Sequence, residues 1–446
     1  MAEPTEEVAE ATEAAAEPTE EVAEATEAAA EATEAVAEAT EAAAEATEAA
    51  AEATEVVAEA TDVVAEATEA PVVEATIEAT PEPAAEATEA AVEATAEATT
   101  EAAALIPVSL QLQWVVQSQF AGYFAAKAMG FYEEEGLDVT ILEGAVDIVP
   151  QQVVASGGAQ FGIAWVPKVL ESRAAGADLV NIAQVFQRSG TLQVSFKDKG
   201  IEGVEDLRGQ RVGTWGFGNE HELFAALRAA GIDPNNAEDV QIISQSFDMN
   251  AMLNDELDAA QAMTYNEYAQ VLEAINPATG ELYQPEDLNV INYNDVGTAM
   301  LQDHIFSTES WLAGETDGVA NTDIAVKFIK ASLRGWIYCR DNFDACVQIV
   351  LDNGPTLGQS HMQWQLNEIN RLIWPSPAGV GVMDQALWDQ TVSVAVDSGI
   401  IPEAPGEAAF RTDLAQAAVD ALTADGVDVT GESWQPVEVT LVEGGK

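Results

Sequence analysis

The sequence predicts an α/β protein with two units around a cleft, preceded by a long segment of different composition. Residues 1–104 are almost entirely Ala, Glu, Thr and Val. Residues 108–187 alternate short β-type runs with helical runs, and residues 195–294 repeat that alternation. Strands that alternate with helices favour a mostly parallel sheet between helices, and two such units leave a cleft of the kind that small molecules occupy.

Acidic residues dominate both parts of the chain. Residues 1–104 contain 30 acidic residues and no Lys or Arg, while the remaining 342 residues contain 48 acidic and 16 basic residues. This charge disfavours nucleic acid and anionic membranes as partners, because phosphate binding needs Lys and Arg. No run of 18 apolar residues predicts a membrane span, and the start, MAEPTEEVAE, lacks the regions of a signal peptide.

The first 104 residues are low in complexity, and from Ala30 they repeat every seven residues, beginning with AEATEAV. A coiled coil is disfavoured, because its seam would be mostly Ala and Glu residues three and four apart repel each other. We therefore expect residues 1–104 to be a disordered spacer that tethers the folded part to a surface. As a flexible coil its ends would lie about 55 Å apart.

The first unit, residues 105–195, is expected to start with the strand VSLQLQW. A helix follows, with Ser118 as its N-cap and Gly130 as its C-terminal stop. The runs LDVTILEG, FGIAW and ADLVNIAQVFQ are expected strands. Together they form the first α/β lobe.

The second unit, residues 196–304, is expected to contain the strands RVGTWGF, VQIISQ and LNVINYND. It also contains the helix NEHELFAALRAAGI and a helix that runs into a strand in MLNDELDAAQAMTYNE. Residues 305–446 are expected to return to the first lobe and to be mainly helical.

Several expected strands end in an aromatic residue beside an amide, hydroxyl or carboxylate. The ends are Trp114, Trp165, the turn WGFGNE and the run TYNE. Ligands of open α/β sheets bind at the carboxyl ends of strands. Aromatic faces stack on flat rings, and amides match a heteroaromatic edge. Because these motifs contain no Lys or Arg, a neutral flat ligand is expected rather than a sulfonate or nitrate.

The turn in RVGTWGFGNEHELFAAL has two open interpretations. Asn219 and Glu222 have the spacing of a capping box at the start of the following helix. Alternatively, Trp215 and Phe217 flank a flat ring whose edge Asn219 or Glu220 contacts. The turn lacks the Lys-Ser/Thr end of a phosphate-binding loop, so a free phosphate is not the expected ligand.

Cysteine and histidine indicate neither a metal site nor catalysis. Cys339 and Cys346 are either buried thiols or a disulfide, because on one straight helix they would lie about 10 Å apart, whereas a break at RDNFD would let them meet. The three His residues are scattered without metal-ligand spacing. No catalytic residue, metal or cofactor is expected.

Several motifs together resemble the substrate-binding proteins of ABC importers. They are LQLQWVVQSQFAGYFAAKAMGFYEEEGLDVTILEG, AQFGIAW, GVEDLRGQRVGTWGFGNE and AMTYNEYAQVL. The resemblance covers residues 107–400, and the branch includes binders of sulfonates, nitrate, thiamine pyrimidines and riboflavin. The form QWVVQSQFAGYF is most similar to riboflavin-type members.

The resemblance implies a type II periplasmic-binding-protein fold, with two α/β lobes that close on a ligand. It implies a monomer outside the cytoplasm, commonly lipid-anchored, that delivers its ligand to ABC permease subunits. Riboflavin is the favoured ligand, and a thiamine pyrimidine precursor or a sulfonate or nitrate is the alternative. The implied ligand-binding residues are Trp114, Gln117, Gln119, Phe120, Tyr123, Trp165, Trp215, Phe217, Gly218, Asn219, Glu220, Tyr265, Asn266 and Glu267.

Two other functions are possible on the same fold. A yeast-type thiamine pyrimidine synthase needs a Cys-rich motif and a cofactor-bearing Lys, and the two cysteines here lie in an unrelated helical region. A sensor or adhesion domain would use the same cleft without a permease. Genes for a permease and an ATPase beside this gene would favour import.

Overall fold

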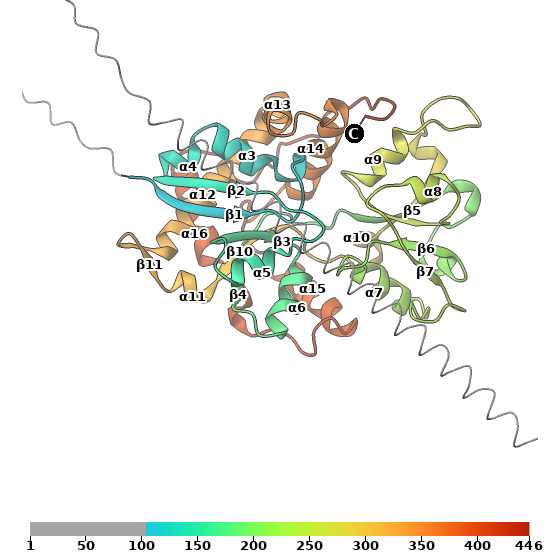
Figure 1. Cartoon of the computed structure of the whole chain (residues 1–446), viewed down its shortest axis with the longest axis horizontal. Helices are drawn as coiled ribbons and strands as arrows, with labels where there is room; N and C mark the ends of the chain where they lie inside the picture. Colours follow the sequence, from blue (N-terminus) through green and yellow to red (C-terminus); the bar gives the residue numbers. More distant parts are fainter. Residues whose placement is uncertain (1–103, 446) are drawn as a thin grey trace, which may run out of the picture. The chain divides into compact units, whose positions relative to one another are not determined.

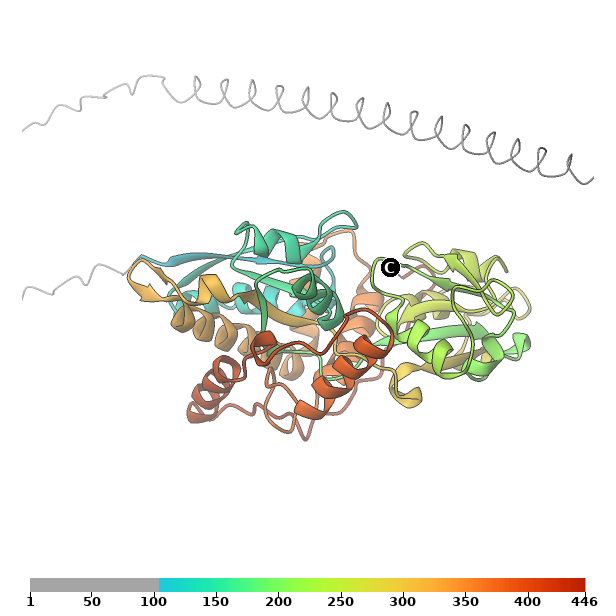
Figure 2. The same cartoon turned by 90° about the horizontal axis from the view of Figure 1, so that it is seen from below.

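The computed structural model describes residues 104–445. The spacer predicted over residues 1–104 therefore lies outside the described residues, except for its last position. Between residues 104 and 445, no helix is long and apolar enough to cross a membrane. Figures 1 and 2 show two groups of strands, one mostly blue to teal and the other green to yellow.

The first group is a five-stranded sheet in the order β2-β1-β3-β10-β4. β1 pairs in parallel with β2 and β3, whereas β10 pairs antiparallel with β3 and β4. β10 was not predicted as a strand, and it runs against its neighbours because it returns from the second group of strands. The strands are β1 (Ile106–Gln111), β2 (Leu137–Leu142), β3 (Phe161–Ala164), β4 (Leu179–Gln184) and β10 (His304–Thr308).

Helices cover this sheet, and most of them come from the C-terminal third of the chain (Figure 1). The N-terminal ones are α3 (Ala121–Ala128), α4 (Phe131–Glu134), α5 (Pro150–Ala155) and α6 (Val166–Ala174). The later ones are α11 (Glu309–Leu312), α12 (Asn321–Asp341), α13 (Phe343–Asn353), α14 (Gln359–Ile373), α15 (Gln385–Asp397) and α16 (Asp413–Ala424), with a small hairpin of β11 (Glu315–Thr316) and β12 (Val319–Ala320).

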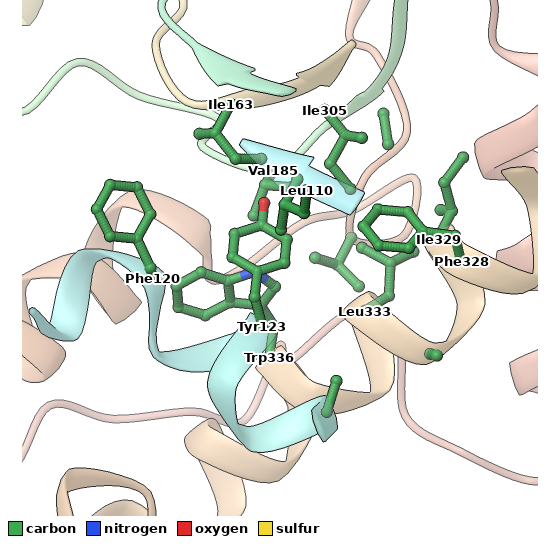
Figure 3. Packing of buried hydrophobic residues seen from close by; sticks show 14 of the residues in the cluster. Leu110, Phe120, Tyr123, Ile163, Val185, Ile305, Phe328, Ile329, Leu333 and Trp336 are labelled. Atoms are coloured by element: carbon green, nitrogen blue, oxygen red, sulfur yellow. The ribbon is translucent and has the colours of Figure 1, made fainter. Parts of the chain in front are cut away.

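Helices α3 and α12 approach so closely that glycine is required where they cross. A Cβ atom on Gly335 would lie 2.0 Å from the Gly122 carbonyl oxygen, and one on Gly122 would lie 2.3 Å from the Trp336 ring. These distances are too short for any side chain, so the crossing depends on both glycines. Figure 3 shows the core that results, with Trp336 beside Phe120 and Tyr123.

The predicted ends of the first helix have different outcomes. Gly130 follows α3 in the left-handed conformation with φ of 73°, which confirms it as the stop. The prediction for Ser118 is wrong. Its hydroxyl donates to the Met362 carbonyl oxygen at 2.9 Å, because Ser118 lies in the short turn Ser118–Phe120 and faces α14.

The second group of strands forms two small sheets. The order of the three-stranded sheet is β8-β5-β9, with antiparallel pairs, and β6 pairs in parallel with β7. The strands are β5 (Thr191–Phe196), β6 (Arg211–Thr214), β7 (Gln241–Ser244), β8 (Ala260–Met263) and β9 (Leu288–Asn292). The helices are α7 (His221–Ala229), α8 (Asn250–Leu253), α9 (Glu267–Leu272) and α10 (Tyr293–Val296).

Strand β5 was not predicted. Its polar residues Thr191, Gln193 and Ser195 are all buried and hydrogen-bonded, for example from Gln193 Nε2 to the Gly213 carbonyl oxygen at 3.0 Å. We call the part built on the five-stranded sheet the first lobe and the part built on β5 to β9 the second lobe. The boundaries predicted at residues 195 and 304 stay a prediction.

Cys339 and Cys346 form a disulfide, with Cα atoms 5.0 Å apart. The pair can meet because α12 ends at Asp341 and α13 begins at Phe343, so the helix breaks between the two cysteines. Of the two alternatives for these residues, the structure therefore contains the disulfide. It closes the corner between α12 and α13 on the first lobe.

Candidate functional site

A cavity of about 280 Å³ opens where strands of both lobes end. Its wall includes residues that follow β1, β3, β6 and β8, which is the arrangement expected for a ligand site in an α/β fold. Of the residues expected at the site, the structure brings these to the cavity wall: Trp114, Gln117, Gln119, Trp165, Trp215, Phe217, Asn219, Tyr265, Asn266 and Glu267. Their contact with a ligand stays a prediction.

Phe120 and Tyr123 lie elsewhere, which corrects their assignment to the site. Both are buried in the core of the first lobe, and the Tyr123 ring meets the Trp336 ring edge-on at 5.7 Å (Figure 3). Tyr123 lies in the first turn of α3 and Phe120 directly precedes that helix, and both are part of the buried cluster that includes Trp336 of α12.

Gly218 and Glu220 also lie outside the main cavity. Gly218 lines a separate void of about 10 Å³, behind the cavity wall, which it shares with Trp165 and His221. Glu220 directly precedes α7, and its Oε2 atom is buried without a hydrogen-bond partner among the described residues. Neither residue lines the cavity, although their neighbours Phe217 and Asn219 do.

The capping box proposed for Asn219 and Glu222 is wrong. Asn219 Nδ2 donates to the Gly216 carbonyl oxygen at 2.7 Å, and its Oδ1 accepts from Lys168 Nζ at 2.8 Å. The Glu222 carboxylate is buried and accepts from the Met300 backbone N–H at 2.6 Å. Both side chains face other elements, so neither caps the helix.

The turn holds Phe217 in an unusual conformation. Gly216, Phe217 and Gly218 have φ angles of 68°, 55° and 79°, and such positive values are strained for Phe but easy for Gly. The Phe217 side chain is 80% exposed at the rim of the cavity. It therefore does not form a ring-binding pair with Trp215 in this structure.

Phe247, rather than Phe217, is the aromatic residue that faces the Trp215 ring. Phe247 lies between Trp114 of the first lobe and Trp215 of the second, with ring centroids 4.7 Å and 6.1 Å away. The Trp215 and Phe247 rings are nearly parallel, at 17°. Trp215 Nε1 is buried without an acceptor among the described residues, so it can donate to a molecule in the cavity. Phe247 was missed, although it follows β7 as the other aromatics follow their strands.

The cavity also holds a cation that the strand-end motifs did not indicate. Lys168 lies one turn after Trp165 in α6, and its Nζ is 5.1 Å from the centre of the Trp165 ring. Burial lowers the pKa of Lys168 to about 8, although Glu220 and Asp303 oppose the shift. The spacing of three residues from Trp165 was the signal that could have placed Lys168 beside it.

Side-chain amides form a row behind and along the cavity wall. The buried Asp303 carboxylate accepts from Gln113 at 2.6 Å and from Gln119 at 2.9 Å, and Gln119 in turn accepts from Gln117 at 2.7 Å. Burial raises the pKa of Asp303 to about 6, while its bonds to the two glutamines act against that shift. Gln113 and Asp303 were not predicted.

Carboxylates outnumber cations around the cavity. Glu171 and Glu267 line it together with Lys168, and Asp303 lies behind it. Burial raises the pKa of Glu267. Among residues 104–445, no group of three or more His, Cys, Asp or Glu side chains has the arrangement of a metal site. The arrangement is suited to stacking on a flat ring and to hydrogen bonding with its edge.

Relatives of this chain include binding proteins and synthases. The riboflavin-binding protein RibY of Chloroflexus aurantiacus is 26% identical over 305 residues, or 66% of this chain and 81% of that protein. The formylaminopyrimidine-binding protein of Halalkalibacterium halodurans is 25% identical over 253 residues, 56% and 71% of the two chains. The 4-amino-5-hydroxymethyl-2-methylpyrimidine phosphate synthase of Legionella pneumophila is 28% identical over 135 residues, 30% and 43% of the two chains.

The fold is shared with solved structures of low sequence identity. The periplasmic sulfonate-binding protein SsuA from Methylobacillus flagellatus KT matches with a TM-score of 0.50 at 15% identity, over 76% of this chain and 99% of that chain. The two-lobed periplasmic-binding-protein fold is thereby confirmed. Residues 117–345, half of the chain, match the NMT1/THI5-like family, and the chain belongs to that family.

Proposed function

We propose that this protein is the substrate-binding component of an ABC importer and that it carries a neutral, flat heteroaromatic vitamin or precursor, with riboflavin favoured. The aromatic wall supports this most directly. Trp114 and Trp165 come from the first lobe, and Trp215 and Tyr265 come from the second. A flat ring between faces from both lobes gains about 0.5–1.5 kcal/mol per aromatic pair beyond the burial of its surface.

Charge favours a neutral ligand over a sulfonate or nitrate. Lys168 is the one Lys or Arg among the residues that line the cavity, and its ammonium already donates to Asn219. Glu171 and Glu267 add two carboxylates to the same wall. Sites for small anions use Arg, Lys or free backbone N–H groups, and extra carboxylates weaken such sites.

Riboflavin is favoured because the relative with the widest coverage of the three is named for binding it. A thiamine pyrimidine precursor is the second candidate, since Glu267 offers a buried carboxylate to an exocyclic amino group and another relative is named for binding a formylaminopyrimidine. Both ligands use the same aromatic faces.

We propose no enzymatic activity. Relatives that are named as synthases match over 30% of the chain in the Legionella case and 56% in that of Aspergillus parasiticus, against 66% for the riboflavin-binding protein. Both cysteines are joined in the disulfide far along the chain from the strand ends that form the cavity, so the Cys-rich motif expected for that enzyme has no counterpart here.

We further propose that the protein works outside the cytoplasm as a monomer, tethered through residues 1–104. The Cys339–Cys346 disulfide supports an oxidising compartment, where disulfides persist. The partner would be a pair of ABC permease subunits that receive the ligand-loaded form. In this arrangement the acidic spacer connects the lobes to the membrane surface and lets them contact the permease.

Thermal unfolding of the full chain with a panel of ligands tests the proposal. Riboflavin, a hydroxymethyl pyrimidine, taurine and nitrate are added at equal excess. A ligand present at 100 times its dissociation constant adds about 2.7 kcal/mol to the free energy of unfolding. We expect a shift with riboflavin or with the pyrimidine. A shift with taurine or nitrate alone would contradict the aromatic-site account.

A further inference from the structure

The amides of the cavity wall are linked to one residue outside the cavity, Gln365 of α14. Gln365 is fully buried and does not line the cavity. Its Nε2 group donates to Gln117 Oε1 at 3.2 Å in the first lobe and to Asn266 Oδ1 at 3.0 Å in the second. Both hydrogens of this one amide group are therefore used, and each goes to a residue of the cavity wall.

A backbone group decides which way Gln365 points. Its Oε1 accepts from the Ser118 backbone N–H at 3.1 Å. A backbone N–H can only donate, so the oxygen of Gln365 must face Ser118 and its NH₂ group must face Gln117 and Asn266. The usual ambiguity between the two ends of an amide is absent here.

The orientation of Gln365 also determines which ends of the neighbouring amides donate and accept, in both lobes. Since Gln117 must accept from Gln365, its own NH₂ group donates to Gln119, and Gln119 donates to the Asp303 carboxylate. On the second lobe, Asn266 Oδ1 accepts from Gln365 and also lies 2.9 Å from His361 Nε2, while the Asn266 NH₂ group donates to the Glu267 carboxylate at 2.7 Å. An ionised carboxylate only accepts, so both ends of the row agree with the direction that Ser118 sets.

The direction determines what the row leaves for a ligand. Within the described hydrogen bonds, Gln117, Gln119 and Asn266 each keep one unused N–H, and within this row only Gln113 has a wholly free oxygen. Gln151 also lines the cavity but does not belong to the row. We propose that Gln365 is a positioning residue that fixes these amides as donors, so that the cavity selects flat heterocycles with an acceptor-rich edge. This inference rests on the proposed binding of a flat heteroaromatic ligand.

Two flat bicyclic probes of equal size test it on the full chain at neutral pH. Lumazine, a pteridine-2,4-dione, presents carbonyl acceptors where 2,4-diaminopteridine presents amino donors. The wild type is expected to bind lumazine more tightly, by about tenfold. In Gln365→Glu the side chain can no longer donate, so its carboxylate faces the oxygens of Gln117 and Asn266 and displaces the amides that Gln365 held. The affinity ratio is then expected to fall by about tenfold, toward the diamino probe.

Gln363→Glu on the same helix is the matched control, because it adds the same charge at a partly exposed position and is expected to leave the ratio unchanged. If Gln365→Glu does not fold, Gln365→Met removes the donors without burying a charge, and the ratio should approach one. A folded variant that weakens both probes equally, or a wild type without preference, overturns the inference but not the proposed function. If the wild type binds neither probe, no riboflavin and no hydroxymethyl pyrimidine, the proposed function fails and the inference falls with it.

Discussion

Trp215 is the residue on which the ligand account depends most. It lies in the turn after β6, its ring faces Phe247, and its ring N–H has no acceptor among the described residues. Trp215→Ala is expected to weaken ligand binding at least about tenfold, or about 1.4 kcal/mol, through the loss of the stacking face. The change is measured by titration of the ligand found in the thermal panel.

Trp434→Ala provides the control for that substitution. Trp434 packs on the core of the first lobe and is not part of the cavity wall, so its loss should affect stability and leave affinity intact. Wild-type affinity in Trp215→Ala would show that the turn only packs the lobe.

Glu222 should make stability depend on pH. Burial raises its pKa to about 7, against the opposing effect of its bond to the Met300 N–H. The folded state therefore holds a proton that the unfolded state releases near its ordinary pKa of about 4.3, and this contribution to stability is lost as the pH rises from there through about 7.

Glu222→Gln keeps the shape of the side chain and removes the titration. As the pH rises across that range, the free energy of unfolding of the wild type should fall relative to that of Glu222→Gln. Urea unfolding of both proteins measures the difference. If the difference between the two free energies of unfolding does not change with pH, Glu222 has the same pKa in the folded and unfolded states.

At the scale of single residues, the sequence predicted the site well where a strand end places a side chain. Trp114, Trp165 and Trp215 reach one cavity because the strands that precede them end on the same side. Phe247 follows β7 in the same way and was overlooked. Tyr123 was misassigned because helical spacing alone does not distinguish a face that packs on α12 from one that faces a cleft.

Among the elements, the corner between α12 and α13 has the clearest testable consequence. The Cys339–Cys346 bond closes a short loop, and such a bond stabilises by about 2 kcal/mol through the restricted unfolded chain. Replacing both cysteines by Ser should lower the free energy of unfolding by about that amount. Reduction of the wild type should have the same effect and should leave the double variant unchanged.

Thiol counting checks the same bond independently. The unfolded wild type should show no free thiol before reduction and two afterwards, because these are its only cysteines. Two free thiols in the protein as purified from its native compartment would contradict both the disulfide and the proposed location.

Strands were predictable where apolar runs mark burial on both faces, and they were missed where polar residues are buried. β5 alternates Thr191, Gln193 and Ser195 with apolar residues, and all three polar side chains are enclosed by neighbouring strands. β10 returns to the first sheet beside β3 and β4, which is a long-range pairing that local pattern does not specify.

The whole molecule holds its two lobes together partly through side chains at the cavity. Lys168 of the first lobe donates to Asn219 of the second at 2.8 Å, and Gln365 donates to Asn266. Proteins with two lobes around a cleft close by hinge motion when ligand contacts both lobes. We expect the radius of gyration, measured by X-ray scattering, to fall when ligand saturates the wild type.

Lys168→Met should reduce that ligand-induced change, because it removes the only Lys or Arg that lines the cavity and its bond to the opposite lobe. Lys330→Met serves as its control, since Lys330 pairs with Glu135 at 2.8 Å away from the cavity. Equal changes in all three proteins would show that Lys168 has no part in closure.

The central claim is that this cavity holds a flat heteroaromatic molecule between aromatic faces of both lobes. The most direct measurement is a titration of riboflavin with the full chain, followed by flavin fluorescence, with the hydroxymethyl pyrimidine as competitor. The account predicts saturable quenching at one flavin per chain. If the pyrimidine binds the same cavity, it should displace the flavin and reverse the quenching. Absence of quenching, together with no detectable binding of the pyrimidine alone, would contradict it.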